Sequence, residues 1–239
     1  MRSDGRANDQ LRPVVITPRY LDHHPASALV RIGKTWVLCV ASVAEEVPLW
    51  LKDQAQGWVT AEYGLLPAST HTRTPRETAL TGARGRTLEI QRMIGRSLRA
   101  ALDLRKLGQR TITVDCDVIQ ADGGTRTAAI TGGYVALALA VNELIKSGAV
   151  HRNIWRAPVA AVSVGVVQGQ PMLDLCYEED SQAEVDFNVV MTARGQFVEI
   201  QGTAEGQPFD RAMMDMLLNL AEKGIKELLA LQKQALASG

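Results

Sequence analysis

The sequence predicts an α/β (α+β) fold in which mixed sheets pack against helices, and three observations support this class. Short β-branched segments of alternating polarity occur in both halves of the chain. Longer segments with helical spacing of apolar residues separate them. The 239 residues are 46% hydrophobic and 22% charged, which is ordinary for a globular protein. Because no repeat, low-complexity tract or linker interrupts the chain, we expect one domain over residues 1–239.

The helices and strands expected from the sequence are given in chain order. Strands are expected at residues 12–18, 27–33 and 35–43, and loops at residues 44–83, including a mobile polar segment at about 65–82. One helix is expected at residues 86–107, ending at Gly108. A strand at 110–119 and a helix at about 127–147 come next. Two hairpins, formed by residues 158–167 with 171–178 and 184–192 with 196–203, precede a last helix at 210–235.

Composition restricts the compartment and the partners. The three cysteines (Cys39, Cys116 and Cys176) lie in apolar, strand-like segments, so we expect buried thiols in a reducing, cytoplasmic setting. The four histidines show no zinc-ligand spacing with them. The N-terminus lacks the apolar core of a signal peptide, and no uncharged apolar segment reaches membrane-spanning length, so no membrane partner is expected.

The net charge of zero conceals a strong asymmetry. Residues 71–110 hold ten basic residues and three acidic ones, whereas residues 174–215 hold ten acidic residues and two arginines. Such segments suit an anionic ligand at one place and a cation or basic partner at another, or they neutralise each other in the fold.

The segment ADGGTRTA at residues 121–128 lies between a predicted strand and a predicted helix. A helix N-terminus presents unpaired N–H groups and a partial positive charge, and the glycines let a ligand approach closely. Thr125 and Arg126 add a hydroxyl and a planar cationic fork. The spacing matches neither a Walker loop nor a dinucleotide fingerprint, so it indicates a phosphate or phosphodiester site, or else a glycine-rich turn with a surface arginine.

Two further patterns could contribute chemistry. If residues 180–188 are extended, Asp180, Glu184 and Asp186 share one face, which predicts a metal-binding or proton-transferring carboxylate pair, or a solvated sheet face. In the basic helix, Arg92, Arg96 and Arg99 form a stripe at i, i+4 and i+7 that could pair with Glu89 and Asp103. Arg86 stands in the first turn, where a cation opposes the helix dipole unless it faces an anion.

Together these segments resemble the ribonuclease PH family of phosphate-dependent 3′ exoribonucleases. The similarity extends from GRANDQLRP to the last helix. It is carried by the blocks QAQGWVTAEYGLLP, GRTLEIQRMIGRSLRAALDL, DCDVIQADGGTRTAAITG, VAAVSVGVV, EDSQAEVDFNVVMT and EIQGTAEGQPF. One departure is Ala68, which follows LLP where the family often has an arginine.

The resemblance implies an activity and its participants. It implies trimming of tRNA precursors from the 3′ end with release of nucleoside 5′-diphosphates, the reverse addition of nucleotides, and related rRNA processing. Inorganic phosphate is the implied co-substrate and Mg²⁺ the helper ion. The implied assembly is a homohexamer built as a trimer of dimers.

The resemblance also assigns residues to roles. Phosphate binding falls on Arg86, Gly124, Thr125 and Arg126, and catalysis on Asp180 and Asp186, which are also the implied Mg²⁺ ligands. RNA binding falls on Arg73 and Arg76 in the segment at about 65–82. Two alternatives stay open: a non-catalytic RNA-binding subunit of an exosome-like ring, and a hydrolytic metal-dependent nuclease.

Overall fold

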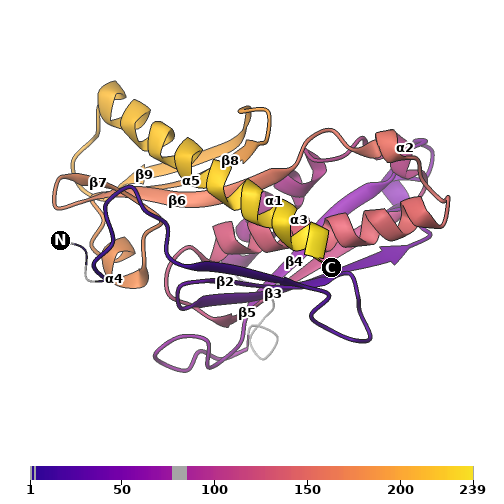
Figure 1. Ribbon diagram of the computed structural model, residues 1–239, viewed down its shortest axis with the longest axis horizontal. Coiled ribbons are helices and arrows are strands. Elements are labelled where there is room, and N and C mark those ends of the chain that lie inside the picture. Colours follow the sequence, from indigo (N-terminus) through magenta and orange to yellow (C-terminus); the bar gives the residue numbers. More distant parts are fainter. Residues whose placement is uncertain (1, 3, 77–84, 239) are drawn as a thin grey trace.

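The computed structural model describes residue 2, residues 4–76 and residues 85–238 (Figure 1). The first elements are β1 (Val14–Pro18), β2 (Ser27–Ile32), β3 (Thr35–Ala44), η1 (Leu49–Leu51), β4 (Trp58–Leu65), α1 (Gly85–Arg99), α2 (Leu104–Leu107), β5 (Thr111–Gln120) and α3 (Thr125–Lys146). The later elements are η3 (Arg152–Ile154), β6 (Val159–Val167), β7 (Gln170–Leu173), α4 (Tyr177–Asp180), β8 (Val185–Thr192), β9 (Phe197–Ala204) and α5 (Arg211–Ser238).

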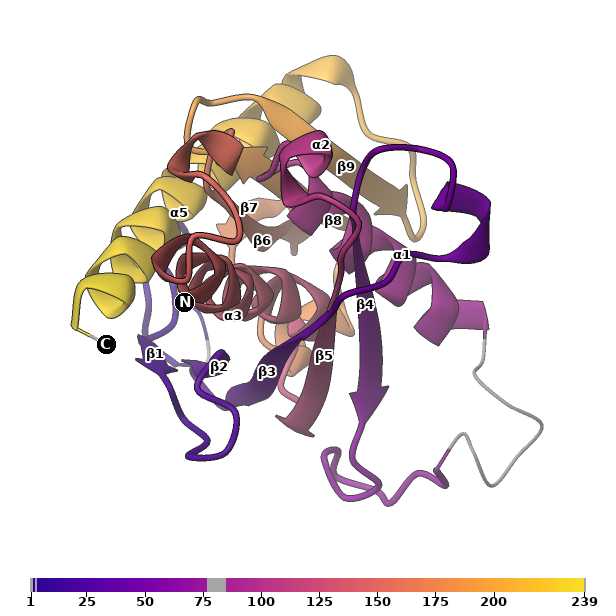
Figure 2. The same cartoon turned by 90° about the vertical axis from the view of Figure 1, so that its right-hand side faces the viewer.

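Two sheets sandwich the helix α3. The first has the strand order β1-β2-β3-β5-β4, with only β4 and β5 parallel among its pairs, and the second has the antiparallel order β7-β6-β8-β9. Figure 2 shows α3 between the sheets, and it packs on β2 and β3 on one side and on β6 on the other. The long helix α5 covers the second sheet along β6 and β7. The mixed α/β class with helices packed on sheets is confirmed.

The helix α3 is apolar on every side because it forms the centre of the core. Its residues from Thr127 to Val141 are all buried. Of the described helices, it alone has the length and hydropathy that a membrane span requires, and 78% of that window is buried inside the protein. Burial between two sheets therefore explains its composition. The three cysteines are free and buried, as expected.

Three local expectations are wrong. Residues 44–83 are not loops throughout, because β4 forms by parallel pairing with the distant strand β5. The helix expected at residues 86–107 breaks after Arg99 into α1 and α2. In the break, Asp103 donates its N–H to the carbonyl of Ile154 at 2.8 Å, and Ala101 accepts from Arg156 at 2.8 Å. These tertiary bonds replace helical ones. The third is the extended conformation expected from Asp180 onward, because Asp180 is the last residue of the helix α4.

Candidate active site

A turn at residues 121–124 joins β5 to α3. Gly123 and Gly124 have φ values of +75° and +64°, a region that side chains disfavour. A Cβ on Gly123 would lie 2.5 Å from the carbonyl oxygen of Leu175, so this position requires glycine. Gly124 is the N-cap of α3 and provides no side-chain cap for the first-turn amides. The N-cap residue thus leaves the first-turn amides without a side-chain partner, which is the arrangement in which a helix N-terminus can bind an anion.

The turn is held from behind by the buried Arg12. Its Nη2 and Nε atoms lie 2.7 and 3.0 Å from the two carboxylate oxygens of Asp174. Its Nη1 atom also donates to the carbonyl of Asp122, and Nη2 donates to that of Gly123 at 3.4 Å. The Thr35 hydroxyl donates to the same Gly123 carbonyl at 2.7 Å. The carbonyl groups of the turn are thus fixed toward the interior.

Polar side chains surround the first turn of α3. The hydroxyls of Thr125 and Tyr63 lie 2.8 Å apart. Burial raises the pKa of Tyr63, while the positive charges of Arg86 and Arg126 act in the opposite direction. Both arginines therefore lie in the electrostatic neighbourhood of this hydroxyl pair. Arg126 donates from Nη1 to Oε1 of Gln201 at 2.7 Å.

The acidic side of the site consists of Asp180 and Asp186. Desolvation, reinforced by the negative charge of Asp180, raises the pKa of Asp186 to about 6 against the opposing effect of Arg126. Its Oδ1 atom is buried and makes no hydrogen bond to the residues that the structure describes, while Oδ2 accepts from Nδ2 of Asn188 at 3.4 Å. Asp180 is exposed at the surface, yet the surrounding protein displaces enough water to raise its pKa, against Arg126 and Arg86.

The acidic residues reach this position differently from the sequence expectation. Asp180 ends the short helix α4, and the strand β8 begins only at Val185, so the alternation assumed for residues 180–188 is wrong at its start. Glu184 does not join the pair, because its Oε1 accepts from the backbone N–H of Gly169 at 3.0 Å. The local pattern misread α4 because that helix has only four residues.

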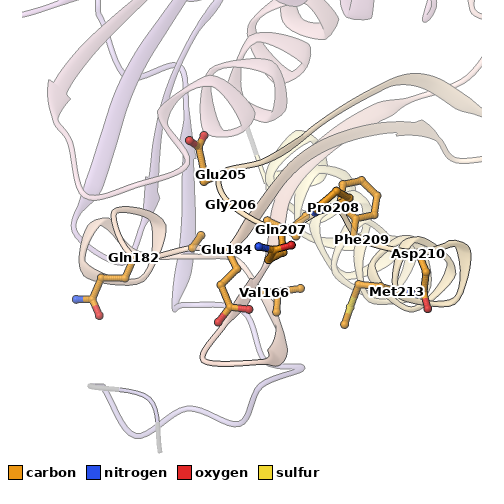
Figure 3. A pocket seen from close by; sticks show the side chains of 12 residues that line it. Val166, Gln182, Glu184, Glu205, Gly206, Gln207, Pro208, Phe209, Asp210 and Met213 are labelled. Atoms are coloured by element: carbon orange, nitrogen blue, oxygen red, sulfur yellow. The ribbon is translucent and has the colours of Figure 1, made fainter.

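A pocket of about 690 Å³ lies at the start of β8, where Glu184 and Val185 line it; Asp180 and Asp186 are not among its lining residues (Figure 3). The loop after β9 forms one wall and contributes Glu205, Pro208 and Phe209. The charge of Glu205 adds to the effects that raise the pKa of Asp180 and of Asp186. The charges of Glu205 and Arg126 therefore act on the pKa of both carboxylates in opposite directions.

The structure gathers most of the predicted site residues in one place. Charge interactions link Arg86 and Arg126 to Asp180, and Thr125 and Gly124 form the start of α3 beside Arg126. Arg73 and Arg76 are exposed in the loop after β4. That loop contacts the site, because the Ser69 carbonyl accepts from the N–H of Ala121 at 2.8 Å and the His71 ring lies 6.1 Å from that of Tyr177. Residues 77–82 of the expected RNA-binding segment lie outside the described residues.

Three polar residues at the site carried no role in the sequence analysis: Arg12, Tyr63 and Gln201. Each contacts a site residue from a distant part of the chain, 62 to 111 residues away. All three belong to segments that carry the family resemblance, and that membership was the only available signal.

The arginine stripe of α1 pairs differently from the expectation. Arg96 binds Glu199 and Arg99 lies over Trp58, rather than both pairing with Glu89 and Asp103.

Together these groups form a helix N-terminus without a side-chain cap, close to two arginines and two carboxylates. A model of domain 1 of the 3′ exoribonuclease family matches residues 10–142, and a model of domain 2 of that family matches residues 157–224. The chain belongs to the ribonuclease PH family of 3′ exoribonucleases. The family models place a boundary between residues 142 and 157, and the single-domain organisation stays a prediction.

Solved structures support the same fold. A chain of the Archaeoglobus fulgidus exosome with RNA bound to the active site has a TM-score of 0.78 at 22% identity, over 96% of this chain and 91% of that one. Rice (Oryza sativa) Rrp46 has a TM-score of 0.77 at 18% identity, covering 99% and 100%. A chain of an archaeal exosome core has a TM-score of 0.76 at 23% identity, covering 97% and 91%. At these identities the similarity establishes the fold alone.

Proposed function

We propose that this chain is a phosphate-dependent 3′-to-5′ exoribonuclease that trims RNA 3′ ends, including those of tRNA precursors, and releases nucleoside 5′-diphosphates. The observation that carries the proposal is that Arg126, in the uncapped first turn of α3, and Arg86 are close enough to Asp180 for their charges to act on it, and that Arg126 also acts on Asp186. Such a site can hold an attacking phosphate next to a scissile phosphodiester, because the arginines offset the repulsion between the two anions.

In the proposed reaction, phosphate is held by the first-turn amides of α3, the Thr125 hydroxyl, Arg126 and Arg86. One of its oxygens attacks the terminal phosphorus in line. The new P–O bond forms as the bond to the 3′ oxygen of the preceding nucleotide breaks. That 3′ oxygen takes up a proton, and the released product is a nucleoside 5′-diphosphate. The reverse reaction adds nucleotides from diphosphates when phosphate is scarce.

The carboxylate pair fits two roles that have different requirements. With a pKa of about 6, Asp186 retains a protonated fraction near neutral pH and could supply the proton to the leaving oxygen. Asp180 and Asp186 also fit Mg²⁺, since Oδ1 of Asp186 is a buried oxygen without a hydrogen-bond partner in the described part of the chain, and Mg²⁺ commonly combines one or two carboxylates with substrate oxygens. Bound there, the ion would neutralise charge that develops on the phosphoryl group.

A pH profile separates these roles. If Asp186 donates the proton, kcat falls as pH rises through the apparent pKa of Asp186 in the substrate complex, because the donor ionises. If the two aspartates act as Mg²⁺ ligands, kcat instead rises through that region, because the ligands must be ionised. Asp180→Asn abolishes turnover in either case while RNA still binds.

A second candidate is a non-catalytic RNA-binding subunit of an exosome-like ring. The observation that favours it is the fold similarity to chains from exosome structures. The presence of Arg86, Arg126, Asp180 and Asp186 in one neighbourhood favours the enzyme, since RNA threading alone requires no such pairing of cations with desolvated carboxylates.

We propose a homohexameric ring, a trimer of dimers, acting in the cytoplasm; mass photometry tests the hexamer.

One assay tests the activity. Purified protein is incubated with RNA carrying a single-stranded 3′ tail, with and without inorganic phosphate and with Mg²⁺ present, and the products are identified by mass spectrometry. Phosphorolysis yields nucleoside diphosphates only when phosphate is present. Monophosphates without phosphate would indicate a hydrolytic nuclease, and intact RNA would indicate a binding subunit.

A further inference from the structure

A hydrogen-bonded chain of three side chains runs across the site from α1 to α3. Arg126 donates from Nη1 to Oε1 of Gln201 at 2.7 Å. Gln201, on β9, donates in turn from Nε2 to Oε1 of Glu89 on α1. The amide thus uses its acceptor on the arginine and its donor on the glutamate, so both ends of the amide are fixed.

The backbone of Gln201 is fixed by its partner strand. Gln201 lies directly across from Asn188 in the β8–β9 register. Cross-strand partners project to the same face of a sheet. Asn188 donates from Nδ2 to Oδ2 of Asp186 at 3.4 Å. In this cross-strand pair, Gln201 therefore contacts Arg126, the predicted phosphate-binding arginine, and Asn188 contacts the carboxylate of Asp186.

The contact leaves Arg126 able to bind an anion. A guanidinium group has five N–H donors in a planar fork, and Gln201 accepts from Nη1. The neutral amide restrains the rotation of this long side chain without cancelling its charge, as a carboxylate at the same place would. Donors held in position before the ligand arrives lose less conformational freedom when it binds.

We propose that Gln201 is a positioning residue for the phosphate nucleophile, orienting Arg126 toward the N-terminus of α3, and that Glu89 fixes the Gln201 amide. This inference rests on the proposed function in that Arg126 is taken to bind phosphate. It assigns Gln201 no contact with RNA and no proton transfer. Loss of Gln201 therefore weakens phosphate use while leaving the chemical step comparatively intact.

The test is Gln201→Ala, measured at saturating RNA with varied inorganic phosphate. The KM for phosphate is expected to rise about tenfold, the equivalent of ~1.4 kcal/mol, with kcat changing less than about threefold. Glu89→Gln should stay within about twofold of the wild type, because its amide oxygen can still accept from Gln201, whereas Glu89→Ala should raise the phosphate KM about threefold. A merely structural role would lower the melting temperature without this split between KM and kcat.

Glu199→Gln is the matched control. Glu199 lies two residues from Gln201 on the same face of β9 and also binds a side chain of α1, since its carboxylate oxygens lie 2.8 Å from Nε and from Nη2 of Arg96. The control weakens a contact between the same two elements, because glutamine keeps only one of the two oxygens that accept from Arg96, and that contact does not involve Arg126. Its phosphate KM should match that of the wild type.

Calorimetric titration of the RNA-free protein with inorganic phosphate separates this inference from the proposed function. Wild-type protein that binds phosphate but releases no diphosphate, with binding weakened about tenfold in Gln201→Ala, would refute the function and support the inference. Wild-type phosphorolysis with an unchanged phosphate KM and Kd in Gln201→Ala would overturn the inference and leave the function standing. An equal change in Glu199→Gln would also overturn it.

Discussion

Replacing Asp186 with asparagine should stabilise the protein while abolishing its turnover. The Asp186 carboxyl is desolvated, one of its oxygens accepts no hydrogen bond from residues 4–76 or 85–238, and Asp180 repels its ionised form. Asparagine keeps the shape and an oxygen that can accept from Asn188, but it cannot ionise. A residue retained at a cost to stability is typical of a functional site.

The magnitude follows from the pKa. The pKa of Asp186 rises from an ordinary value of 3.8 to about 6 in the folded protein. About two units correspond to roughly 3 kcal/mol at most, and partial contact with water reduces this to about 1–2 kcal/mol. Because the folded-state pKa is raised, ionisation opposes folding. The cost is absent below pH ~4, grows as pH rises toward 6 and is complete above that value.

The assay is urea unfolding of the wild type and Asp186→Asn at several pH values from 4.5 to 8, at one protein concentration. A fixed concentration is needed because subunit association contributes to apparent stability. The variant should be more stable by about 1–2 kcal/mol at pH 8, with the gain shrinking toward pH 4.5. Asp22→Asn is the control, since Asp22 is exposed on a loop and should show a flat difference. A pH-independent difference for Asp186→Asn, or a loss of stability at pH 8, would refute the reasoning.

Three further predictions concern the arginines. Arg126→Ala should raise the phosphate KM about 10- to 100-fold, because charge-assisted hydrogen bonds are each worth roughly 1.5–3 kcal/mol; unchanged phosphate kinetics would remove Arg126 from the site. The double variant Arg73→Ala with Arg76→Ala should weaken RNA binding and flatten its dependence on salt, as measured by fluorescence anisotropy at several KCl concentrations; an unaltered salt slope would contradict the assignment. Arg12→Ala should lower the free energy of unfolding by about 3–5 kcal/mol, because it leaves the buried Asp174 without its closest cation; a loss below about 1 kcal/mol in urea unfolding would contradict this role.

Local sequence patterns were sufficient where an element depends on its own residues. The helix α3 and the turn before it were predicted because the glycines, Thr125 and an apolar segment follow one another directly. The same holds for the hairpins β2–β3 and β8–β9, whose strands are neighbours in the chain. These predictions placed the glycine turn and the start of α3 where the structure has them; that an anion binds there stays a prediction.

Patterns failed where a distant segment decides the outcome. The strand β4 forms on β5, and the helix expected at residues 86–107 is broken by bonds to residues 154 and 156. The carboxylates were chosen correctly as neighbours but for the wrong local reason, since Asp180 comes from a helix and only Asp186 from a strand. Their proximity results from the folding of residues 177–185, not from alternation along one strand.

The sequence by itself determined the mixed α/β class, the family and the glycine turn that precedes α3, because each depends on residues that are adjacent in the chain or on recognisable sequence blocks. Only the tertiary structure decided how Arg126 is held, which carboxylate is hardest to ionise and what fixes the turn from behind. The physical reason is that these features depend on hydrogen bonds between distant residues, made by Gln201 and Arg12, and on the desolvation of Asp186. Neither distant contacts nor desolvation can be read from a local sequence pattern.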